Sequence, residues 1–600
     1  MPGPPRGQAP NRLARPRPVA AGAALLAGAT VLALTVGRAA EPAKAGEEQT
    51  RPNIVVLFTD DQETGSMRVM KTVNKEMKRK GVTMKHFYAN FPLCCPSRAT
   101  MLTGQYAHNH KVLSNQAPVG GYGVFNELHG DNNLAVWMQN AGYETSYIGK
   151  FMNEYAEPDE YGTLPRDVPK GWDDWHVLAP SKAEYFGFTL NQNGNLTGRG
   201  QRKRDYSTDV FTEKARKFIR RNSPGPDPFF LMLGYAAPHG GGGGSPGRAC
   251  NRAAEPAPRH LGTLKDERKG LLPSSFNEAD VSDKPSPIAQ RDPLTTGQIR
   301  DTLRKRRCAW ESLLAVDESV GEILDQIKRN GEARNTYIFY LSDNGYMRGE
   351  HRVRNNKRYL YEVSARVPFI ARGPGFARNA KSSDVATNAD LVPTIAQLTG
   401  VAPGLVPDGQ SLVPTLRRPT FENGRAALLE AYAGDEIIGL RTSRYLYAEW
   451  DTEQVLPEIE LYDNYADPYQ LNNLARDPAR ATVVADLRQQ LRELIDCAGA
   501  ACIQHPTAQL DFATSGAGKG DCALTPVIAR VFSPNQGQIS QIDFRVDRAF
   551  AGSDTEAPFE VALPDKLLRN ALPKSAEVVA EVNFDDGRRL GVPAKIKVCK

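Results

Sequence analysis

Short, continuous runs of apolar residues recur along the chain, and longer segments with helical spacing separate them. Such uninterrupted, β-branched runs are typical of parallel strands that are buried on both faces of a sheet. The runs lie at residues 53–59, 145–148, 229–235, 336–341 and 367–371. Segments with the spacing of helices lie at residues 134–141, 208–221 and 299–330. This alternation predicts an α/β domain, with a large mixed, mostly parallel sheet sandwiched by helices.

The pattern changes twice towards the C-terminus. Residues 444–450 alternate like a half-exposed antiparallel strand and residues 484–495 have helical spacing, which predicts a smaller α+β C-terminal subdomain. Beyond it, β-like runs at 527–532, 541–546, 559–563 and 578–584 are separated only by turns, so we expect an appended β-sandwich-like segment. The predicted boundaries are 46–424 for the α/β domain, 425–510 for the subdomain and 511–600 for the β-rich segment.

The first 45 residues have the order of a secretory signal. A basic start, from Arg6 to Arg17, precedes 18 uncharged residues at 19–36, and small residues follow. An uncleaved N-terminal anchor is the alternative, because the apolar run approaches membrane-spanning length. Its many Ala and Gly residues make it only weakly hydrophobic. We therefore expect a cleaved signal peptide at 1–45 and a secreted protein with no stable membrane span.

The composition is that of an ordinary globular protein, with 40% hydrophobic and 24% charged residues among 600, which excludes a fibrous or wholly disordered chain. The formal net charge of +6 at first suggests a polyanionic partner. Residues 1–45 hold six of the 75 basic and one of the 69 acidic residues, so their removal leaves 69 and 68, a net charge of +1. The mature protein is nearly neutral, and we expect no nucleic-acid partner.

The eight cysteines agree with export, because disulfides persist outside the cytosol. Cys497 and Cys502 are close enough in sequence for a local disulfide, and Cys522 and Cys599 enclose the final segment. The sequence does not fix their pairing.

The most specific motif is the run Cys94-Cys95-Pro96-Ser97-Arg98-Ala99-Thr100-Met101-Leu102-Thr103-Gly104. It resembles the signature C-x-P-S-R-x-x-x-L-T-G of the sulfatase family, within the alkaline phosphatase superfamily. The resemblance implies that Cys94 is converted to Cα-formylglycine by a formylglycine-generating enzyme. A hydrated aldehyde has two hydroxyls, so one attacks sulfur and the other expels sulfate. A serine has no second hydroxyl and would stay sulfated.

Two polar pairs, Asp60-Asp61 and Asp343-Asn344, each follow a predicted strand. Taken alone, such a pair is typical of a turn or a helix cap. In an open α/β sheet, however, the carboxyl ends of the strands form the site, and oxygen-rich side chains there suit a hard cation. Together with the signature they predict a metal site. The resemblance supports the same four residues, with the modified Cys94, as ligands of Ca²⁺, with Mg²⁺ as the alternative.

Further residues match motifs of the family one by one. The resemblance implies that Lys150, in the Gly149-Lys150 block, faces the formylglycine, that His239 contacts sulfate, and that Lys357 bridges sulfate and the leaving oxygen. Arg98 would stabilise the formylglycine hydroxyls. Physically, Arg98, Lys150, Lys357 and the cation would neutralise charge on the sulfuryl oxygens. Either His239 or Lys357 would support the leaving oxygen, and the sequence does not decide which is the acid.

Within the family, the chain is most similar to N-acetylglucosamine-6-sulfatases and extracellular heparan endosulfatases, over roughly residues 51–500. Two features depart from the pattern. Met152 stands where many sulfatases have a histidine, although the glucosamine-6-sulfatase branch also lacks it. Five glycines, Gly240 to Gly244, follow His239 where relatives carry larger residues, so inherited glycosaminoglycan specificity is in doubt.

The resemblance implies a secreted sulfatase that hydrolyses an aryl sulfate or a sulfated sugar such as N-acetylglucosamine-6-sulfate. One alternative is a phosphomonoester or phosphonate monoester hydrolase of the same superfamily. Such sites often bind two zinc ions through several histidines, whereas none of the nine histidines here is paired with the Asp motifs. A second alternative is a non-catalytic binder of sulfated glycans, which the intact catalytic set disfavours.

Overall fold

The computed structural model describes residues 51–597, apart from 159–164, 242–249, 251, 266–271, 420–422, 453–455, 504–507, 515–516, 519–521, 524–525, 534–537 and 571–574. The predicted leader at 1–45 lies outside the described residues. Within the described part of the chain, no helix is long and apolar enough to cross a membrane.

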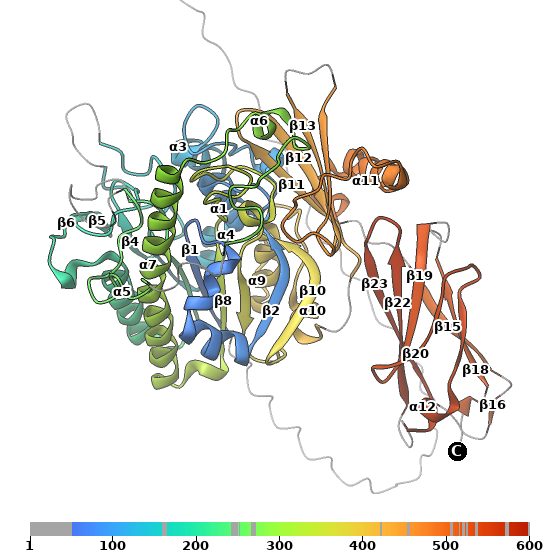
Figure 1. The fold of residues 1–600 in the computed structure, drawn as a ribbon. Coiled ribbons are helices and arrows are strands. Elements are labelled where there is room, and N and C mark those ends of the chain that lie inside the picture. Colours follow the sequence, from blue (N-terminus) through green and yellow to red (C-terminus); the bar gives the residue numbers. More distant parts are fainter. Residues whose placement is uncertain are drawn as a thin grey trace, which may run out of the picture. The chain divides into compact units, whose positions relative to one another are not determined.

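A ten-stranded sheet forms the centre of the α/β domain (Figure 1). In order across the sheet, its strands are β10 (Ala380–Thr387), β2 (Val82–Tyr88), β9 (Phe369–Arg372), β8 (Thr336–Ser342), β1 (Asn53–Thr59), β7 (Phe229–Gly234), β3 (Glu144–Gly149), β4 (Asp174–Leu178), β5 (Thr189–Gln192) and β6 (Asn195–Gly198). The strands β8, β1, β7, β3 and β4 are parallel, and β9, β5 and β6 are antiparallel to their neighbours. The predicted mixed, mostly parallel sheet is confirmed.

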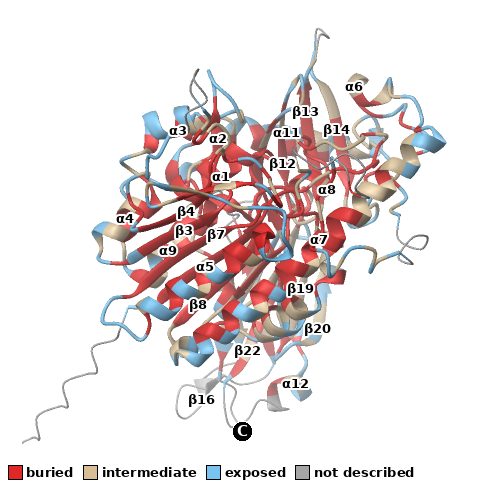
Figure 2. Ribbon diagram, turned by 90° about the vertical axis from the view of Figure 1, so that its left-hand side faces the viewer, coloured by how far each residue is buried: buried red, intermediate tan, exposed pale blue. Residues whose placement is uncertain are grey.

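Apolar side chains project from both faces of this sheet into hydrophobic cores, as the continuous apolar runs predict. In β1, Ile54, Val56 and Phe58 join one core, whereas Val55 and Leu57 join the other. The first core contains residues of α1 (Cys94–Thr103), α3 (Gly121–His129), α4 (Leu134–Asn140), α9 (Leu391–Thr399) and α10 (Val413–Arg417). The second contains residues of α5 (Ser207–Asn222) and α7 (Thr296–Arg329). Figure 2 shows the buried strands between helices whose outer sides are exposed.

The long helix α7 begins earlier than the predicted start at residue 299. Thr295 caps it, because its hydroxyl accepts from the backbone amide of Gln298 at 3.3 Å while the Gln298 side chain accepts from the Thr295 amide at 2.9 Å. A disulfide between Cys308 of α7 and Cys250 ties the preceding excursion of the chain to this helix, and the sequence did not predict that pair.

The subdomain contains an antiparallel sheet of β11 (Ala427–Tyr432), β12 (Glu436–Arg441), β13 (Tyr445–Asp451) and β14 (Glu458–Asp463), with α11 (Ala481–Leu494). The expectation that residues 444–450 form a half-exposed strand is wrong. Residues 445–450 are all buried, because Leu446 and Trp450 face one core while Tyr445 and Tyr447 face a second core that α11 completes. The predicted disulfide between Cys497 and Cys502 is confirmed.

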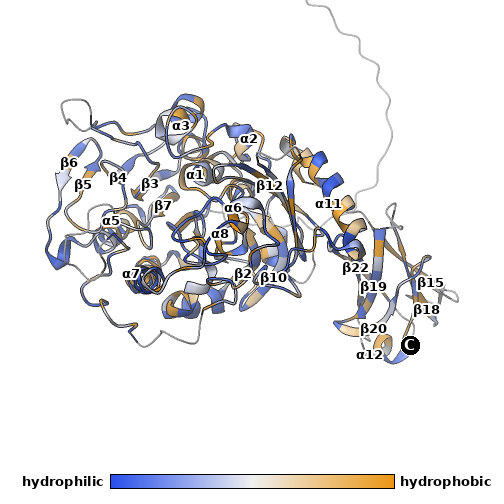
Figure 3. Ribbon diagram, turned by 45° about the horizontal axis from the view of Figure 1, so that its top comes forward, coloured by the Kyte–Doolittle hydropathy of each residue, from blue (hydrophilic) through white to orange (hydrophobic). Residues whose placement is uncertain are grey.

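The C-terminal segment contains two antiparallel sheets that share one apolar core. One is formed by β15 (Gln509–Thr514), β18 (Val527–Phe532) and β21 (Glu560–Leu563), and the other by β20 (Ala549–Asp554), β19 (Ile539–Val546), β22 (Ala576–Phe584) and β23 (Arg589–Ile596). Buried and partly exposed residues alternate along β22, as one buried face requires, and hydrophilic residues of this strand occupy partly exposed positions (Figure 3). Cys599, which together with Cys522 encloses this segment in the sequence, lies outside the described residues.

Shorter elements include α2 (Ala107–His110), α6 (Ser286–Ala289), α8 (Glu362–Ala365), α12 (Asp565–Asn570), β16 (Ala517–Gly518) and β17 (Cys522–Ala523).

Candidate active site

The carboxyl ends of four neighbouring strands, β8, β1, β7 and β3, carry predicted site residues. Asp60 directly follows β1, Asp343 directly follows β8, and Lys150 directly follows β3. His239 lies five residues beyond the end of β7. Because these strands are parallel, their carboxyl ends meet at one edge of the sheet, where open α/β sheets hold their sites.

A sharp turn after β1 brings the carboxylates of Asp60 and Asp61 close to each other. Asp61 has a φ of 72°, in the left-handed region that non-glycine residues rarely occupy. Its backbone amide donates to Oδ1 of Asp343 at 3.3 Å, and the next amide, of Gln62, donates to the Ser342 hydroxyl at 3.0 Å. Backbone strain of this kind persists where the surroundings fix it, and it is frequent at functional sites.

The helix α1 carries the signature motif, and Cys94 is its first residue. The side chain of Cys94 therefore lies at the positive end of the helix dipole. The Ser97 hydroxyl donates to the backbone carbonyl of Asp343, which ties the helix to the end of β8. At the other end, Gly104 has a φ of 75°, and an added Cβ there would lie 2.9 Å from the Val392 side chain. Ser97 and Gly104 thus have structural reasons to be in the motif.

Arg98 joins two carboxylates of the site. Its Nε and Nη2 donate to Oδ2 of Asp343 at 2.9 and 2.8 Å, and Nη2 lies 3.2 Å from Oδ2 of Asp60. Its Nη1 donates to the backbone carbonyl of Lys150 at 2.7 Å. The hydrogen bonds of the guanidinium are therefore made to groups that surround Cys94. This geometry makes Arg98 a positioning residue for the two carboxylates.

Lys357 lies closest to the nucleophile position. Its Nζ is 2.7 Å from Sγ of Cys94, 2.5 Å from Oδ1 of Asp61 and 3.5 Å from Oδ1 of Asn344. The side chain is only 9% exposed, so this ammonium group is held among groups that carry or share negative charge. It can therefore neutralise charge on a group bound at Cys94.

Lys150 and His239 approach from the other strands. The Lys150 ammonium pairs with Asp60, and its Nζ lies 3.9 Å from Sγ of Cys94. Nε2 of His239 lies 3.6 Å from Oδ2 of Asp61, and Nδ1 lies 2.7 Å from the Gly240 carbonyl oxygen. The His239 side chain is 31% exposed, so it lies at the open side of the site.

Mutual neutralisation keeps the buried cations charged. Burial alone would lower the pKa of Lys357, but the carboxylate of Asp61 and neighbouring negative groups raise it well above its usual value. Lys150 behaves in the same way, because Asp60 outweighs burial and raises its pKa. Burial and the charge of Asp60 raise the pKa of Asp343 to about 6.

An unmodified thiol at residue 94 would be a poor nucleophile. Burial and the charge of Asp60 raise the pKa of Cys94 to about 12, although Lys150 and Lys357 act in the opposite direction. Since the thiolate is the reactive form, a cysteine in these surroundings is protonated near neutral pH.

The donor set fits a divalent cation. One ligand atom from each of four side chains lies within 4.8 Å of the others, and these side chains are Asp60, Asp61, Cys94 and His239. Asn344 adjoins them, because its Nδ2 donates to Oδ1 of Asp61 at 2.7 Å. The ammonium of Lys357 contacts Oδ1 of Asp61 and Oδ1 of Asn344, so positive charge is stabilised at this place. Two of the four side chains offer carboxylate oxygens and Asn344 offers an amide oxygen, and such oxygen ligands suit Ca²⁺ or Mg²⁺.

Other residues near the motif have structural contacts. Met152, at the departure from the usual histidine, is fully buried in the core between the sheet and α1. His108 contacts Glu430 at 3.0 Å and the Cys497 carbonyl at 2.8 Å, and Nε2 of His110 lies 3.0 Å from the Thr100 hydroxyl. These histidines hold α2 and α1 in place.

Sequence reasoning missed Asn388, which directly follows β10 and anchors α1. The Nδ2 of Asn388 donates to the carbonyl and the hydroxyl of Ser97 at 3.1 and 2.9 Å. No motif marked it, because it lies 291 residues away in the chain.

Comparison with known proteins adds to this geometry. Residues 52–401 match the family model described as Sulfatase, and residues 349–496 match that of the N-sulphoglucosamine sulphohydrolase C-terminal region. The chain is 31% identical to the N-acetylglucosamine-6-sulfatase of Capra hircus, over 76% of this chain and 86% of that protein. It is 30% identical to an arylsulfatase of Volvox carteri, over 79% of this chain and 80% of that protein.

A solved structure agrees with these relatives. A protein in complex with its substrate, D-glucosamine-2-N,6-O-disulfate, superposes with a TM-score of 0.60 at 26% identity, over 74% of this chain and 97% of that one. A phosphonate monoester hydrolase of Agrobacterium radiobacter shares the fold, with a TM-score of 0.54 at 18% identity.

Proposed function

This chain belongs to the sulfatase family and is a sulfuric ester hydrolase, and from that premise we propose that it is a secreted enzyme that removes sulfate from a sulfated sugar. N-acetylglucosamine-6-sulfate is the substrate we propose first, because relatives with that activity in their names match three quarters of the chain. Extracellular sulfatases among the relatives, and the predicted leader, support secretion.

The proposed nucleophile is Cys94 after conversion to Cα-formylglycine. The modification would supply a hydrated aldehyde, one of whose hydroxyls attacks sulfur. The observation that carries this proposal is the position of Cys94 at the start of α1, with Nζ of Lys357 at 2.7 Å and Oδ1 of Asp60 at 3.4 Å from its sulfur. A carboxylate there can accept a proton from the attacking group, and an ammonium can stabilise the negative charge that develops.

Charge balance supports a bound divalent cation. Asp60, Asp61 and Asp343 are balanced by Arg98, Lys150 and Lys357, so these six side chains have no net charge. A sulfate ester adds one negative charge, and the departing sulfate adds a second. When bound, Ca²⁺ or Mg²⁺ would supply the missing positive charge, with Asp60, Asp61, Asp343, Asn344 and the modified Cys94 as its ligands.

The leaving oxygen needs a proton or a hydrogen bond. His239 lies at the open side of the site and Lys357 lies between Cys94 and Asp61, so both can face the sugar side of the ester. We propose Lys150, His239 and Lys357 as the sulfate-binding residues. We also propose the division of the chain into a signal peptide (1–45), a catalytic domain (46–424), its C-terminal subdomain (425–510) and a β-rich accessory domain (511–600).

Activity assays on the exported protein test this function. We expect hydrolysis of N-acetylglucosamine-6-sulfate and nitrophenyl sulfate, with nitrophenyl phosphate at least about a hundredfold slower by kcat/KM. Cys94→Ala should abolish all of these activities. Cys95→Ala is a matched control, because Cys95 is the neighbouring buried cysteine and lies outside the modified position. A preference for the phosphate would instead favour the phosphomonoester or phosphonate hydrolase alternative.

A further inference from the structure

A loop at residues 347–356 comes directly before Lys357. The two ends of the loop pair with each other, because the amide of Met347 donates to the carbonyl of Asn356 at 2.7 Å and the amide of Asn356 donates back at 3.2 Å. Since Lys357 is the next residue, the place of its ammonium at Cys94 depends on the conformation of this loop.

The backbone of the loop is strained at its tip. His351, Arg352 and Asn355 have φ angles of 51°, 61° and 50°, in the left-handed region that residues with a side chain rarely occupy. Such a conformation persists only where the surroundings fix it. Contacts from outside the loop are therefore needed to hold it.

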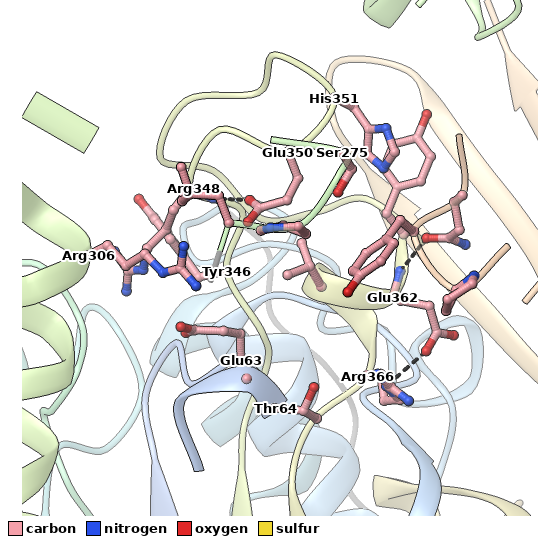
Figure 4. A pocket seen from close by; sticks show the side chains of 18 of the residues that line it. Glu63, Thr64, Ser275, Arg306, Tyr346, Arg348, Glu350, His351, Glu362 and Arg366 are labelled. Atoms are coloured by element: carbon pink, nitrogen blue, oxygen red, sulfur yellow. Dashed lines mark hydrogen bonds and ion pairs between the residues drawn. The ribbon is translucent and has the colours of Figure 1, made fainter. Parts of the chain in front are cut away.

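A second segment, at residues 275–291, supplies these contacts. It belongs to the part of the chain between β7 and α7. The amide of His351 donates to the carbonyl of Ser275 at 2.8 Å, and the amide of Asn277 donates to the carbonyl of Gly349 at 2.8 Å. Figure 4 shows Ser275 and His351 close together where the two segments meet. The tip of the loop is thus paired with a segment far away in the chain.

Arg352 adds three hydrogen bonds to this pairing. Its Nε donates to the carbonyl of Glu278 at 2.9 Å, Nη1 donates to the carbonyl of Arg291 at 2.7 Å, and Nη2 donates to the carbonyl of Ala279 at 2.7 Å. All three nitrogens of the guanidinium therefore hold the backbone of the second segment. An arginine presents its donors in one rigid plane, which a lysine does not.

The side chain of Glu278 fixes the same part of the loop. Its Oε2 lies 2.6 Å from Nδ1 of His351, and its Oε1 lies 3.4 Å from Nζ of Lys284. All three side chains are buried. The ring of His351 also packs on the ring of Tyr361, with 4.3 Å between their centres. A buried pair of this kind leaves the loop tip little freedom to move.

We propose that Arg352 is a positioning residue for Lys357. By binding the carbonyls of residues 278, 279 and 291, it holds the loop in the conformation that places the Lys357 ammonium at Cys94, and Glu278 supports it through His351. The inference rests on the proposed function, in which Lys357 neutralises charge at the nucleophile.

A double-mutant cycle on N-acetylglucosamine-6-sulfate tests the link between the two residues. Arg352→Gln should lower kcat about tenfold or more, because a small misplacement of a group in the site is costly, and should change KM less than about threefold. In the Lys357→Met background, the same replacement should lower kcat less than about twofold. Arg352→Lys should recover only part of the loss. An equal loss of kcat in both backgrounds, or no loss in either, overturns the proposal.

Arg259→Gln is the matched control. Arg259 lies in the same part of the chain between β7 and α7 and also donates from three nitrogens, but to Asp209 and Glu318 at 2.7 to 2.8 Å. Its replacement should leave kcat unchanged, and thermal unfolding shows which variants fold. Should Arg352→Gln not fold, Glu278→Gln takes its place in the cycle. It should lower kcat about threefold or more in the unmodified background and not in Lys357→Met.

If the unmodified protein hydrolyses no sulfate ester, the proposed function fails, and the positioning is tested separately by hydrogen exchange. The amides of Gly349, Val353 and Asn356 are hydrogen-bonded within the loop, so peptides that cover residues 345–358 report on its conformation. These amides should exchange about tenfold faster in Arg352→Gln than in the unmodified protein and in Arg259→Gln. Equal exchange in all three proteins contradicts the role of Arg352.

Discussion

Nζ of Lys357 lies 2.7 Å from Sγ of Cys94. The same ammonium contacts Asp61, so it links the nucleophile position to the proposed metal ligands. Because its side chain is almost fully buried, few water molecules compete for it. A charge that develops on a group bound at Cys94 is therefore opposed at once by a fixed positive charge.

Replacement of this lysine should damage catalysis more than binding. We expect Lys357→Met to lower kcat by about a hundredfold to a thousandfold, because a preorganised donor in a buried site is lost. Lys357→Arg should recover little, since a planar guanidinium does not fit the space of an ammonium held by Asp61 and Cys94. Steady-state kinetics with N-acetylglucosamine-6-sulfate measure kcat for both variants. A kcat within about twofold of the unmodified protein would show that Lys357 has no part in the chemical step.

Removal of divalent cations should lower both activity and stability. A chelator removes the positive charge that would balance a bound sulfate ester, and a cation that binds the folded state alone also stabilises that state. Thermal unfolding with and without chelator, followed by addition of Ca²⁺ or Mg²⁺, identifies the ion.

Asp61→Asn should lose the response of the unfolding temperature to the ion. Asp131→Asn should keep it, because Asp131 is an exposed acid that pairs with Lys170 on the surface. Equal unfolding temperatures of the untreated and chelated protein, with full activity in both, would contradict a bound cation.

The two-nitrogen hydrogen bonding of the Arg98 guanidinium to Asp343 should contribute to activity in addition to its positive charge. Arg98→Lys keeps the charge but cannot donate from two nitrogens to Oδ2 of Asp343, so we expect kcat/KM to fall about tenfold to a hundredfold. Arg425→Lys is the comparison, because Arg425 forms an equally buried pair with Asp390. It should lower the unfolding temperature with a smaller effect on kcat/KM. Equal losses of activity in the two variants would mean that Arg98 acts only through stability.

The buried carboxylate of Glu362 should contribute to stability in a pH-dependent way. Burial alone would raise its pKa, but the charges of Arg366 and Arg441 outweigh burial and lower it from 4.5 to about 2. A group with a lowered pKa stabilises the fold above its unfolded pKa and loses that effect as pH falls towards the folded value. Near neutral pH, Glu362→Gln should therefore cost about 3 kcal/mol.

The cost of Glu362→Gln should shrink between about pH 4.5 and about pH 2. Urea unfolding of both proteins across this range measures it. A cost that does not change with pH would argue against the ion pairs with Arg366 and Arg441.

The sequence predicts the main sheet and the cluster around Cys94 well, because each depends on a local pattern. Continuous apolar runs identify strands such as β1 and β8, and polar residues at the ends of those strands converge wherever the strands are parallel. The burial of β13 could not be predicted, because it depends on α11, which packs on its second face from a later part of the chain.

The mass of the Cys94-bearing peptide from the exported, active protein tests the central proposal most directly. Conversion of a cysteine to formylglycine replaces the thiol by an aldehyde and lowers the mass of the peptide by about 18 Da, whereas Cys95 in the same peptide stays a thiol. We expect the lowered mass in the active fraction, and an alkylating reagent should then label Cys95 alone. A fully active protein in which both cysteines are alkylated, at the unmodified mass, would contradict the mechanism.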